Sequence, residues 1–255
     1  MGDKIRLLDV TSENVTETGV FCIKNKKAPG YKTKLDWFKS KLNNGLRIKI
    51  AQDENDKQIG FIEYIPSELA WRPINASNYL FIQCIVVFDK AARSKKIGSE
   101  LIKACEVDAK QQNKEGVCTM TSDGVWMANK TLFEKNGFTV ADTQDRFELM
   151  YKAFSNKSHT PEFIDWTKQA KKFMGWHLFY ANQCPWHIKS VKDLEKTAAM
   201  NGIDLLITKL STPEVAQSSP SGFGTFSLVH NGKLLSDHYI SSTRFKNIIK
   251  QEETI

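Results

Sequence analysis

No apolar run in the 255-residue sequence approaches the roughly 18–20 residues that a helix needs to cross a bilayer. The first residues, from Met1 to Arg6, also lack the apolar core of a secretory signal peptide. The content of 41% hydrophobic and 25% charged residues is ordinary for a soluble protein. The sequence therefore predicts a soluble, cytoplasmic protein that does not bind membranes.

Paired cysteines are also missing. The five cysteines form no Cys-x-x-Cys pair and no spacing typical of metal ligands. An odd number of thiols in a cytosolic chain argues against a disulfide framework. We therefore expect neither structural disulfides nor a bound metal. The cysteines are Cys22, Cys84, Cys105, Cys118 and Cys184.

The net charge of +7 raises the question of nucleic-acid binding. The lysines are dispersed, however, and the sequence contains neither an arginine-rich face nor a known nucleic-acid module. We therefore expect no nucleic-acid partner. A modest positive field suits a strongly anionic small ligand equally well.

The chain is organised around one stretch in its first half. Residues 78–88 form an apolar run that predicts a strand buried on both faces. Residues 100–112 have apolar side chains at helical spacing. A short basic loop joins them, so free backbone N–H groups and the positive end of a helix dipole meet there. This arrangement binds phosphate, although a basic loop before a helix is in other proteins only a solvated connection.

Within that loop, residues 93–98 read Arg-Ser-Lys-Lys-Ile-Gly. They resemble the Arg/Gln-x-x-Gly-x-Gly/Ala loop of the GCN5-related N-acetyltransferases (GNAT), which holds the pyrophosphate of acetyl-CoA. Lys96 stands where the family has its first glycine. Because only glycine takes positive φ freely, we expect Lys96 to sit at negative φ or the loop to be distorted.

A second resemblance lies at residues 129–138, which are similar to the family's Asn…Phe-Tyr-Glu-Lys-x-Gly-Phe segment. The order of predicted elements over residues 1–154 also agrees with the family. The resemblance implies an α/β (α+β) GNAT acyl-CoA N-acyltransferase fold with a mixed sheet. We expect strands at 4–10, 46–52, 58–65, 78–88, 116–122 and 138–153, and helices at 14–27, 31–44, 100–112 and 128–135.

Residues 155–159 are polar and without pattern, and we place a domain boundary between residues 154 and 155. The remainder, residues 155–255, resembles the thioredoxin fold, with Cys184 at the start of its main helix. The two-part layout resembles YoaP-type acetyltransferases. We expect helices at 161–174, from Cys184 onward and at 242–251, and strands at 176–180, 203–210, 224–230 and 233–235.

The GNAT resemblance implies acetyl-CoA as the cofactor and assigns residues to it. The pyrophosphate is expected on Arg93, Ser94, Lys95, Lys96, Ile97, Gly98 and Ser99, the pantetheine arm on Val86, Val87 and Phe88, and a further contact on Asn129. Phe133 stands where many relatives carry a general-acid tyrosine. Because phenylalanine cannot donate a proton, solvent or another group is expected to protonate the leaving thiolate.

Glu63 is the candidate general base, since it is a carboxylate within an apolar strand next to the cofactor strand. Burial there is expected to raise its pKa toward the useful range. Strand alternation decides its role, because an exposed Glu63 would face only water. Tyr64 is expected on the opposite face of that strand. The candidates for the acceptor pocket are Tyr64, Glu68, Trp71, Arg72 and Cys184.

Cys184 begins a helix, where the helix dipole is expected to lower its pKa. His187 occupies the place of the second cysteine of a thioredoxin-like dithiol, and Gly224 that of the usual proline. The C-terminal part is therefore either a structural or substrate-shaping domain or the carrier of a working thiol.

The sequence as a whole favours an acetyl-CoA-dependent N-acetyltransferase that acts on a primary amine of a small molecule or peptide. Two alternatives stay open: a non-catalytic acyl-CoA-binding sensor or scaffold, and a thiol-redox protein that uses Cys184. We expect a monomer or a homodimer.

Overall fold

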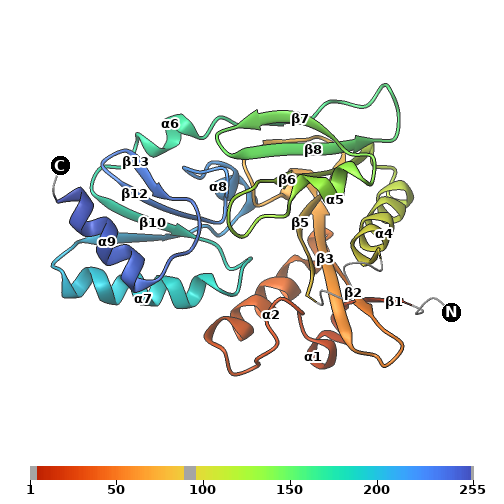
Figure 1. Cartoon of the computed structure of the whole chain (residues 1–255), viewed down its shortest axis with the longest axis horizontal. Coiled ribbons are helices and arrows are strands. Elements are labelled where there is room, and N and C mark those ends of the chain that lie inside the picture. Colours follow the sequence, from red (N-terminus) through yellow and green to blue (C-terminus); the bar gives the residue numbers. More distant parts are fainter. Residues whose placement is uncertain (1–4, 89–95, 254–255) are drawn as a thin grey trace. The chain divides into compact units, whose positions relative to one another are not determined.

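The computed structural model describes residues 5–88 and 96–253 (Figure 1). The chain divides into two compact units. The first unit comprises Met1–Lys24, Phe38–Ala70 and Ile74–Phe163, and the second comprises Asn25–Trp37, Trp71–Pro73 and Ile164–Ile255. The second unit therefore contains segments from the first half of the sequence. The predicted boundary between residues 154 and 155 stays a prediction.

The first unit contains a seven-stranded sheet with the order β1-β2-β3-β5-β6-β8-β7. Only β5 and β6 pair in parallel, so the sheet is mixed, as predicted. Its strands are β1 (Arg6–Asp9), β2 (Arg47–Gln52), β3 (Gln58–Pro66), β5 (Tyr79–Val87), β6 (Gly116–Thr121), β7 (Thr139–Gln144) and β8 (Phe147–Ala153). The helices are α1 (Val15–Thr18), the end of α2 (Pro29–Lys41), η1 (Leu42–Asn44), η2 (Ser67–Leu69), α4 (Ile97–Gln111) and α5 (Lys130–Glu134).

Helix α4 packs along one face of this sheet (Figure 1). Its apolar residues recur at helical spacing and are buried. They pack against alternate residues of β3 and β5, including Ile62, Tyr64 and Ile82. The buried residues of α4 are Ile97, Gly98, Leu101, Ile102, Cys105 and Ala109.

The helix predicted for residues 14–27 is wrong. Helix α1 ends at Thr18, because Gly19 at φ 73° and Phe21 at φ 50° leave the helical region. The amide of Gln58 then donates a hydrogen bond of 2.9 Å to the Thr18 carbonyl at the helix end. The apolar residues that suggested a longer helix, among them Val20, are buried in an irregular segment instead.

The helix predicted for residues 161–174 is also wrong. Glu162–Phe163 forms strand β9, which pairs antiparallel with β4 (Ile74–Asn75). The Phe163 N–H donates to the Asp142 carboxylate at 2.8 Å and is therefore not used by a helix. Only α6 (Thr167–Ala170) is helical in this region.

The second unit contains a four-stranded sheet with the order β11-β10-β12-β13. Strands β10 and β11 are parallel and the other pairs are antiparallel. The thioredoxin-like interpretation of this topology stays a prediction. The elements are β10 (Trp176–Tyr180), α7 (His187–Met200), β11 (Leu205–Lys209), α8 (Pro213–Gln217), β12 (Phe226–His230), β13 (Lys233–Ser236) and α9 (Ser242–Glu252).

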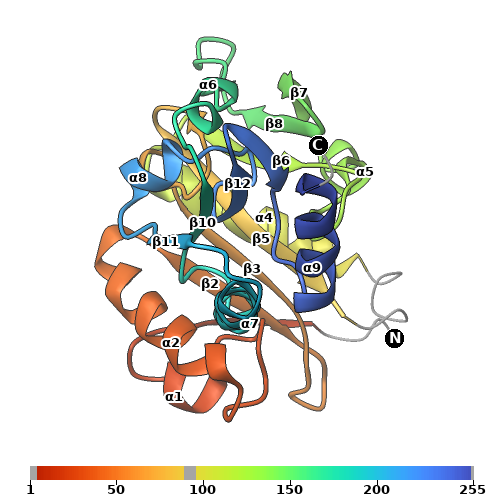
Figure 2. The same ribbon diagram turned by 90° about the vertical axis from the view of Figure 1, so that its left-hand side faces the viewer.

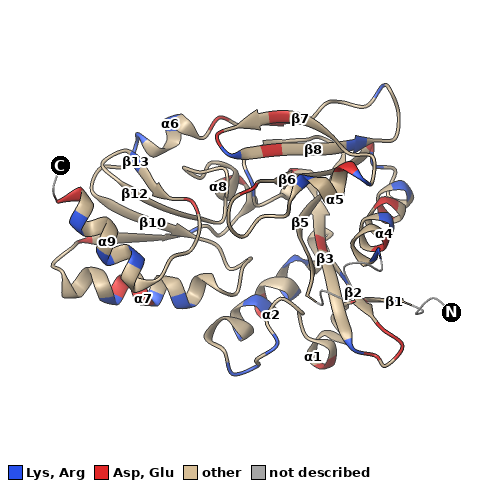
Figure 3. Cartoon of the chain, viewed as in Figure 1, with Lys and Arg blue, Asp and Glu red and all other residues tan. Residues whose placement is uncertain are grey.

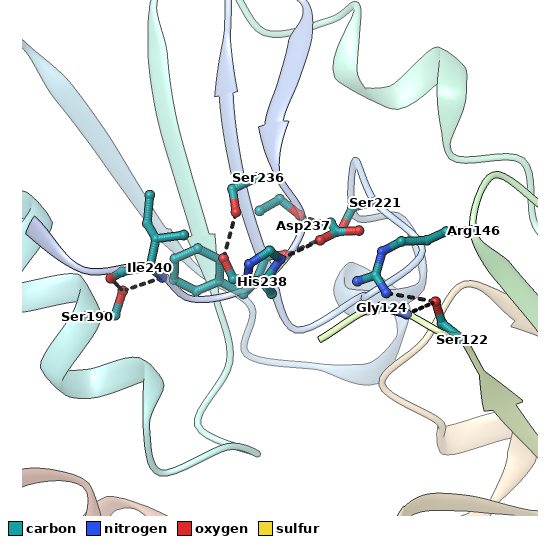
Figure 4. Close-up of polar contacts among 11 residues, drawn as sticks. Ser122, Gly124, Arg146, Ser190, Ser221, Ser236, Asp237, His238 and Ile240 are labelled. Carbon is teal, nitrogen blue, oxygen red and sulfur yellow. Dashed lines mark hydrogen bonds and ion pairs between the residues drawn. The ribbon is translucent and has the colours of Figure 1, made fainter. Parts of the chain in front are cut away.

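Helices α7 and α9 lie side by side on this sheet (Figure 2). Phe245 of α9 meets Trp176 of β10 edge to face, with ring centroids 5.6 Å apart. The Ser190 hydroxyl on α7 donates to the Ile240 carbonyl at 2.7 Å (Figure 4). This bond holds the segment that leads into α9 against α7.

Charged residues of both signs are interspersed along the helices of each unit (Figure 3). In the part of the chain that the structure describes, none of the helices combines the length and apolarity that crossing a bilayer requires. The same residues contain no group of three His, Cys, Asp or Glu side chains placed to hold a metal ion.

Candidate active site

Strand β5 has one edge that is paired only over its first half. Its pairing with β3 runs from Pro66–Leu80 to Gly60–Val87, but its pairing with β6 ends at Ile82–Thr119. The Thr119 hydroxyl donates to the Ile82 carbonyl at 3.0 Å where the two strands part. Beyond this point β6 continues with β8 alone. Among the described strands, none pairs with residues 83–87 on that side of β5, which we call the open edge.

The direction of the β5 amides follows from one hydrogen bond of the ladder. The Phe88 N–H donates to the Ile59 carbonyl of β3 at 3.1 Å. In an antiparallel pair, alternate residues direct their N–H groups to the same neighbour. The Val86 N–H therefore points to β3, whereas the Ile85 N–H points to the open edge. Sequence reasoning named Val86, Val87 and Phe88 but missed Ile85.

The N-terminus of α4 follows β5 along the chain. The first intrahelical bond of α4 runs from the Glu100 N–H to the Lys96 carbonyl at 3.1 Å. The N–H groups of Ile97, Gly98 and Ser99 are therefore the donors that a helix leaves unpaired at its start. Such a helix terminus binds phosphate groups. The predicted contacts Arg93, Ser94 and Lys95 lie outside the described residues.

The backbone conformation of Lys96 differs from the negative φ expected for it. Its φ is 59°, in the left-handed region, and it immediately precedes α4. Its backbone thus adopts the conformation that the family's glycine would favour, and its side chain is exposed. Negative φ, the first of the two alternatives expected for Lys96, is therefore wrong. The second alternative, a distorted loop, concerns residues 89–95, which lie outside the described residues.

The open edge and the α4 terminus fit an extended ligand that carries a pyrophosphate. An edge of backbone amides suits the amide-rich pantetheine arm, and the helix N-terminus suits the phosphates. Gly98 packs closely at this helix start, since a Cβ there would lie 3.0 Å from a methyl group of Leu132. The residues present therefore fit acetyl-CoA.

Glu63 is buried in β3, with 1% of its surface exposed. It lies opposite Ile48 of β2 and Cys84 of β5. Its neighbour Tyr64 packs against α4, so Glu63 lies on the other face of the sheet. The Gln83 amide Nε2 donates to Glu63 Oε1 at 3.3 Å. Glu63 is thus a buried carboxylate next to the half of β5 that carries the open edge.

Tyr64 is not on the face of Glu63. Its hydroxyl donates to the Asp108 carboxylate on α4. Burial, strengthened by the nearby Cys105 and Asp108, raises the pKa of Tyr64 far above its usual range. Tyr64 is therefore a neutral core residue in this structure.

Two further predicted residues act in local turns. Glu68 accepts a 2.7 Å hydrogen bond from the Asn78 N–H and lies 3.8 Å from the Lys114 ammonium. Asn129 caps α5 by accepting from the Thr131 N–H at 2.9 Å. Phe133 is buried against Phe138, with ring centroids 5.4 Å apart, and so lies in the core of the unit. Whether Glu68 or Asn129 also contacts a ligand stays a prediction.

The loop after β6 is held by contacts that the sequence did not signal (Figure 4). The Arg146 guanidinium and the Gly124 N–H both donate to the Ser122 hydroxyl, at 2.9 and 3.0 Å. A Cβ at Gly124 would lie 2.2 Å from Arg146 Nη1, so the close approach depends on glycine. Arg146 is far from Ser122 in the sequence, and nothing in either segment indicates the pairing.

Trp71 and Arg72 belong to the second unit and are buried there. The Arg72 guanidinium donates to the Phe223 carbonyl and, at 3.0 Å, to the Thr225 hydroxyl. It also lies 4.7 Å from the centre of the Phe223 ring. The structure thus gives Arg72 a role in holding the loop before β12, and its predicted contact with a substrate stays a prediction.

Cys184 is half-buried just before α7, and its carbonyl accepts from the His187 N–H at 3.3 Å. His187 is fully buried, and its Nδ1 donates to the Ala181 carbonyl at 2.9 Å. Its Nε2 has no hydrogen-bond partner among the described residues. Burial lowers the pKa of His187 to about 4, and Arg72 and Lys34 contribute by repelling its charged form. His187 is therefore a neutral core residue at neutral pH.

Two protein families match separate parts of the sequence. Residues 45–140 match the family described as acetyltransferase (GNAT) domain. Residues 204–247 match the family described as YoaP-like. The first match spans β2 to β7 and therefore includes Glu63, the open edge of β5 and the start of α4.

One relative is similar along nearly the whole chain. It is the uncharacterized N-acetyltransferase YoaP of Bacillus subtilis (strain 168), which is 27% identical over 95% of this chain and 97% of its own. A GNAT-family acetyltransferase of Staphylococcus aureus Mu50 is 20% identical, with a TM-score of 0.43 over 60% of this chain and all of its own. The Escherichia coli GNAT protein YhbS, solved with CoA, is 11% identical, with a TM-score of 0.42 over 63% of this chain and 89% of its own.

Proposed function

The chain joins a GNAT acetyltransferase domain to a YoaP-like domain, and from this premise we propose that its acceptor is a primary amine of a small molecule or peptide. Acetyl transfer, and acetyl-CoA as the donor, follow from the GNAT family itself. The nature of the acceptor is our proposal. It rests on one observation above all: a buried carboxylate, Glu63, lies beside the open edge of β5.

Bound acetyl-CoA supplies a thioester whose carbonyl carbon accepts the amine. The chain contributes backbone donors on two elements. The Ile85 N–H is available to an acyl oxygen at the open edge, and the N–H groups at the start of α4 are available to the pyrophosphate. In this proposal β5 orients the acyl group and α4 holds the nucleotide end.

Glu63 acts as the general base in this proposal. An amine is an ammonium ion at neutral pH and must lose a proton before it can attack. A buried carboxylate attracts the ammonium and accepts that proton. Because water is largely excluded around Glu63, the attraction is stronger there than at the surface. This charge preference favours cationic amines over neutral hydroxyl acceptors.

As the C–S bond breaks, the leaving thiolate takes up a proton from solvent, and the second proton of the attacking nitrogen is released to solvent in this proposal. Phe133 has no proton to donate, and its ring lies in the core. A thiol is acidic enough that a dedicated acid is helpful but dispensable. The proposed mechanism therefore has one protein base and no protein acid.

We assign the second unit a structural or substrate-shaping role. The residue in the place of a second redox cysteine, His187, is buried and bonded to the Ala181 carbonyl. This use of His187 in the core favours a structural role over thiol-redox chemistry at Cys184. Cytoplasmic location and a monomeric or homodimeric state stay predictions.

The test is an acetylation assay with the full chain, acetyl-CoA and a panel of polyamines, aromatic amines, amino-acid amides and short peptides. We expect a product one acetyl group heavier by mass spectrometry with at least one amine, and no product with matched alcohols. If acetyl-CoA raises the melting temperature but no member of a broad panel is acetylated, the non-catalytic sensor or scaffold is the better account.

A further inference from the structure

Gln83 interrupts the apolar run of β5. It stands at a register shift, where Glu63 pairs with Cys84 while Tyr64 pairs with Ile82. Gln83 is thus the extra residue of a β-bulge, without an opposite residue on β3. Bulges redirect side chains and are common beside active sites. This one lies immediately after the last residue of β5 that pairs with β6.

The bulge brings the Gln83 side chain to the carboxylate of Glu63. The amide Nε2 donates to Glu63 Oε1 at 3.3 Å. An amide donor stabilises a carboxylate more than the neutral acid, because the bond is charge-assisted. It also restricts the rotation of a carboxylate whose surface is only 1% exposed. Both effects act directly on the group that carries the proposed function.

We propose that Gln83 is a positioning residue, which holds and orients the Glu63 carboxylate through its amide donor; this rests on the proposed role of Glu63 as the base. Gln83 acts through Glu63 and is not itself assigned a contact with the substrate. The bulge gives a reason for a polar residue in an otherwise apolar strand. It also couples the backbone of the open edge to the base.

One of the two residues paired directly with Glu63 can also titrate. Residues directly opposite on neighbouring strands share a face of the sheet. On β2 this residue is Ile48, which cannot titrate, and on β5 it is Cys84, whose thiol can. A Cys84→Ala variant therefore serves to separate an effect of the thiol from an effect of the Gln83 amide.

The direct test follows the Glu63 carboxyl carbon by NMR in the free protein as the pH is changed, with Glu63→Gln used to assign the signal. Gln83→Met keeps the size of the side chain but removes the donor to the carboxylate, so the titration midpoint of Glu63 should rise relative to the wild type. Gln83→Lys supplies a positive charge and should lower it. Gln58→Met is the control, because Gln58 is also a glutamine of this sheet, at the start of β3, but its amide donates to the Thr18 carbonyl. It should leave the midpoint unchanged.

The second readout is the pH dependence of kcat/KM with an accepted amine. We expect the acid limb to move upward in Gln83→Met and downward in Gln83→Lys, while the KM for acetyl-CoA changes little. If Gln83 were only structural, both variants would lower activity, but the acid limb of the profile would not move in opposite directions in the two variants.

If neither substitution moves the Glu63 midpoint in variants that still melt cooperatively, the inference is overturned. If the midpoint moves as expected but Glu63→Gln keeps wild-type turnover, the coupling of Gln83 to Glu63 is supported and the proposed base is refuted. The two failures are therefore distinguishable.

Discussion

At the scale of single residues, His187 shows how burial decides protonation. The ring is fully buried among Phe223, Phe226 and Tyr239, and its pKa is lowered to about 4. In the unfolded chain the same imidazole titrates near 6.5. Below that pH the unfolded state therefore binds a proton that the folded state does not bind. The free energy of unfolding decreases as a result.

This sign gives a prediction for the pH dependence of stability. The contribution of His187 is fully present above about pH 6.5 and is lost as the pH falls toward 4, by about 3 kcal/mol in total. In His187→Gln this part of the slope should vanish, whatever the absolute stability of the variant. The measurement is denaturant unfolding at several pH values in that range. His177→Gln, at the half-buried histidine of β10, is the control and should keep the wild-type slope. An unchanged slope in His187→Gln would contradict the assignment.

Lys96 carries a second prediction at this scale. A non-glycine residue in the left-handed region costs on the order of 1 kcal/mol, and Lys96 has φ 59°. Lys96→Gly should therefore raise the free energy of unfolding by about 1 kcal/mol relative to Lys96→Ala. Both variants lose the same charge, so their difference isolates the backbone. Equal stability of the two would show that the turn into α4 is not strained in solution.

At the scale of elements, local sequence patterns predicted the helices and strands whose buried residues recur at regular spacing. The hairpin of β2 and β3, the strand β5 and the helix α4 all follow from alternation, helical spacing and a turn-rich loop, and all are confirmed. Helices at residues 14–27 and 161–174 are wrong for a common reason. Their apolar residues are buried by irregular chain or by a distant strand, such as β4 against β9, which no local pattern encodes.

The candidate site likewise combines features that the local sequence predicts with features that depend on distant pairings. The carboxylate of Glu63 in an apolar strand was predicted from the sequence, as was the start of α4 as the proposed phosphate site. Gln83 was not singled out from the sequence, because its contact with Glu63 depends on a bulge. The separation of β5 from β6 after Ile82 depends on pairings over some forty residues, and periodicity cannot report where a pairing ends.

The open edge itself is testable by amide hydrogen exchange measured by NMR. In the free protein the Ile85 N–H should exchange faster than the Val86 N–H, because only Val86 points into the β3 ladder. Acetyl-CoA should slow Ile85 by roughly tenfold or more and leave Val86 nearly unchanged. Val86 is thus the control within the same strand. Equal protection of both amides before and after addition would refute the open edge as the binding surface.

At the scale of the whole molecule, the compact units do not follow chain order. The second unit includes Asn25–Trp37 and Trp71–Pro73, and within it Trp71 is 1% exposed. Trp37 meets Trp71 edge to face, with ring centroids 5.8 Å apart. The sequence suggested two consecutive domains. The two short segments that belong to the second unit could not be recognised, because their amino-acid composition does not differ from that of their neighbours.

We therefore expect the fragment of residues 1–154 to be unstable by itself. It would lack the loop before β12, where the buried Arg72 guanidinium donates to the Phe223 carbonyl and the Thr225 hydroxyl. A buried charged donor that loses its acceptors destabilises the fold around it. The measurement compares the fragment with the full chain by thermal unfolding and dye binding.

The control for this truncation is the full chain cut once at a protease site inserted among the exposed residues 155–157. The cut chain retains every segment of the second unit and should keep a melting temperature near that of the intact protein. A fragment of residues 1–154 that melts as cooperatively and as high as the intact chain would contradict the division into units.

The central claim is that this protein transfers acetyl groups with Glu63 as the base, and the pH–rate profile of Glu63→Gln tests it most directly. The amide keeps the shape of the side chain, so acetyl-CoA affinity should stay nearly unchanged. Turnover with an accepted amine should fall by roughly 10²–10⁴-fold, and the acid limb of the profile should disappear. Wild-type rates for Glu63→Gln at every pH would contradict the claim.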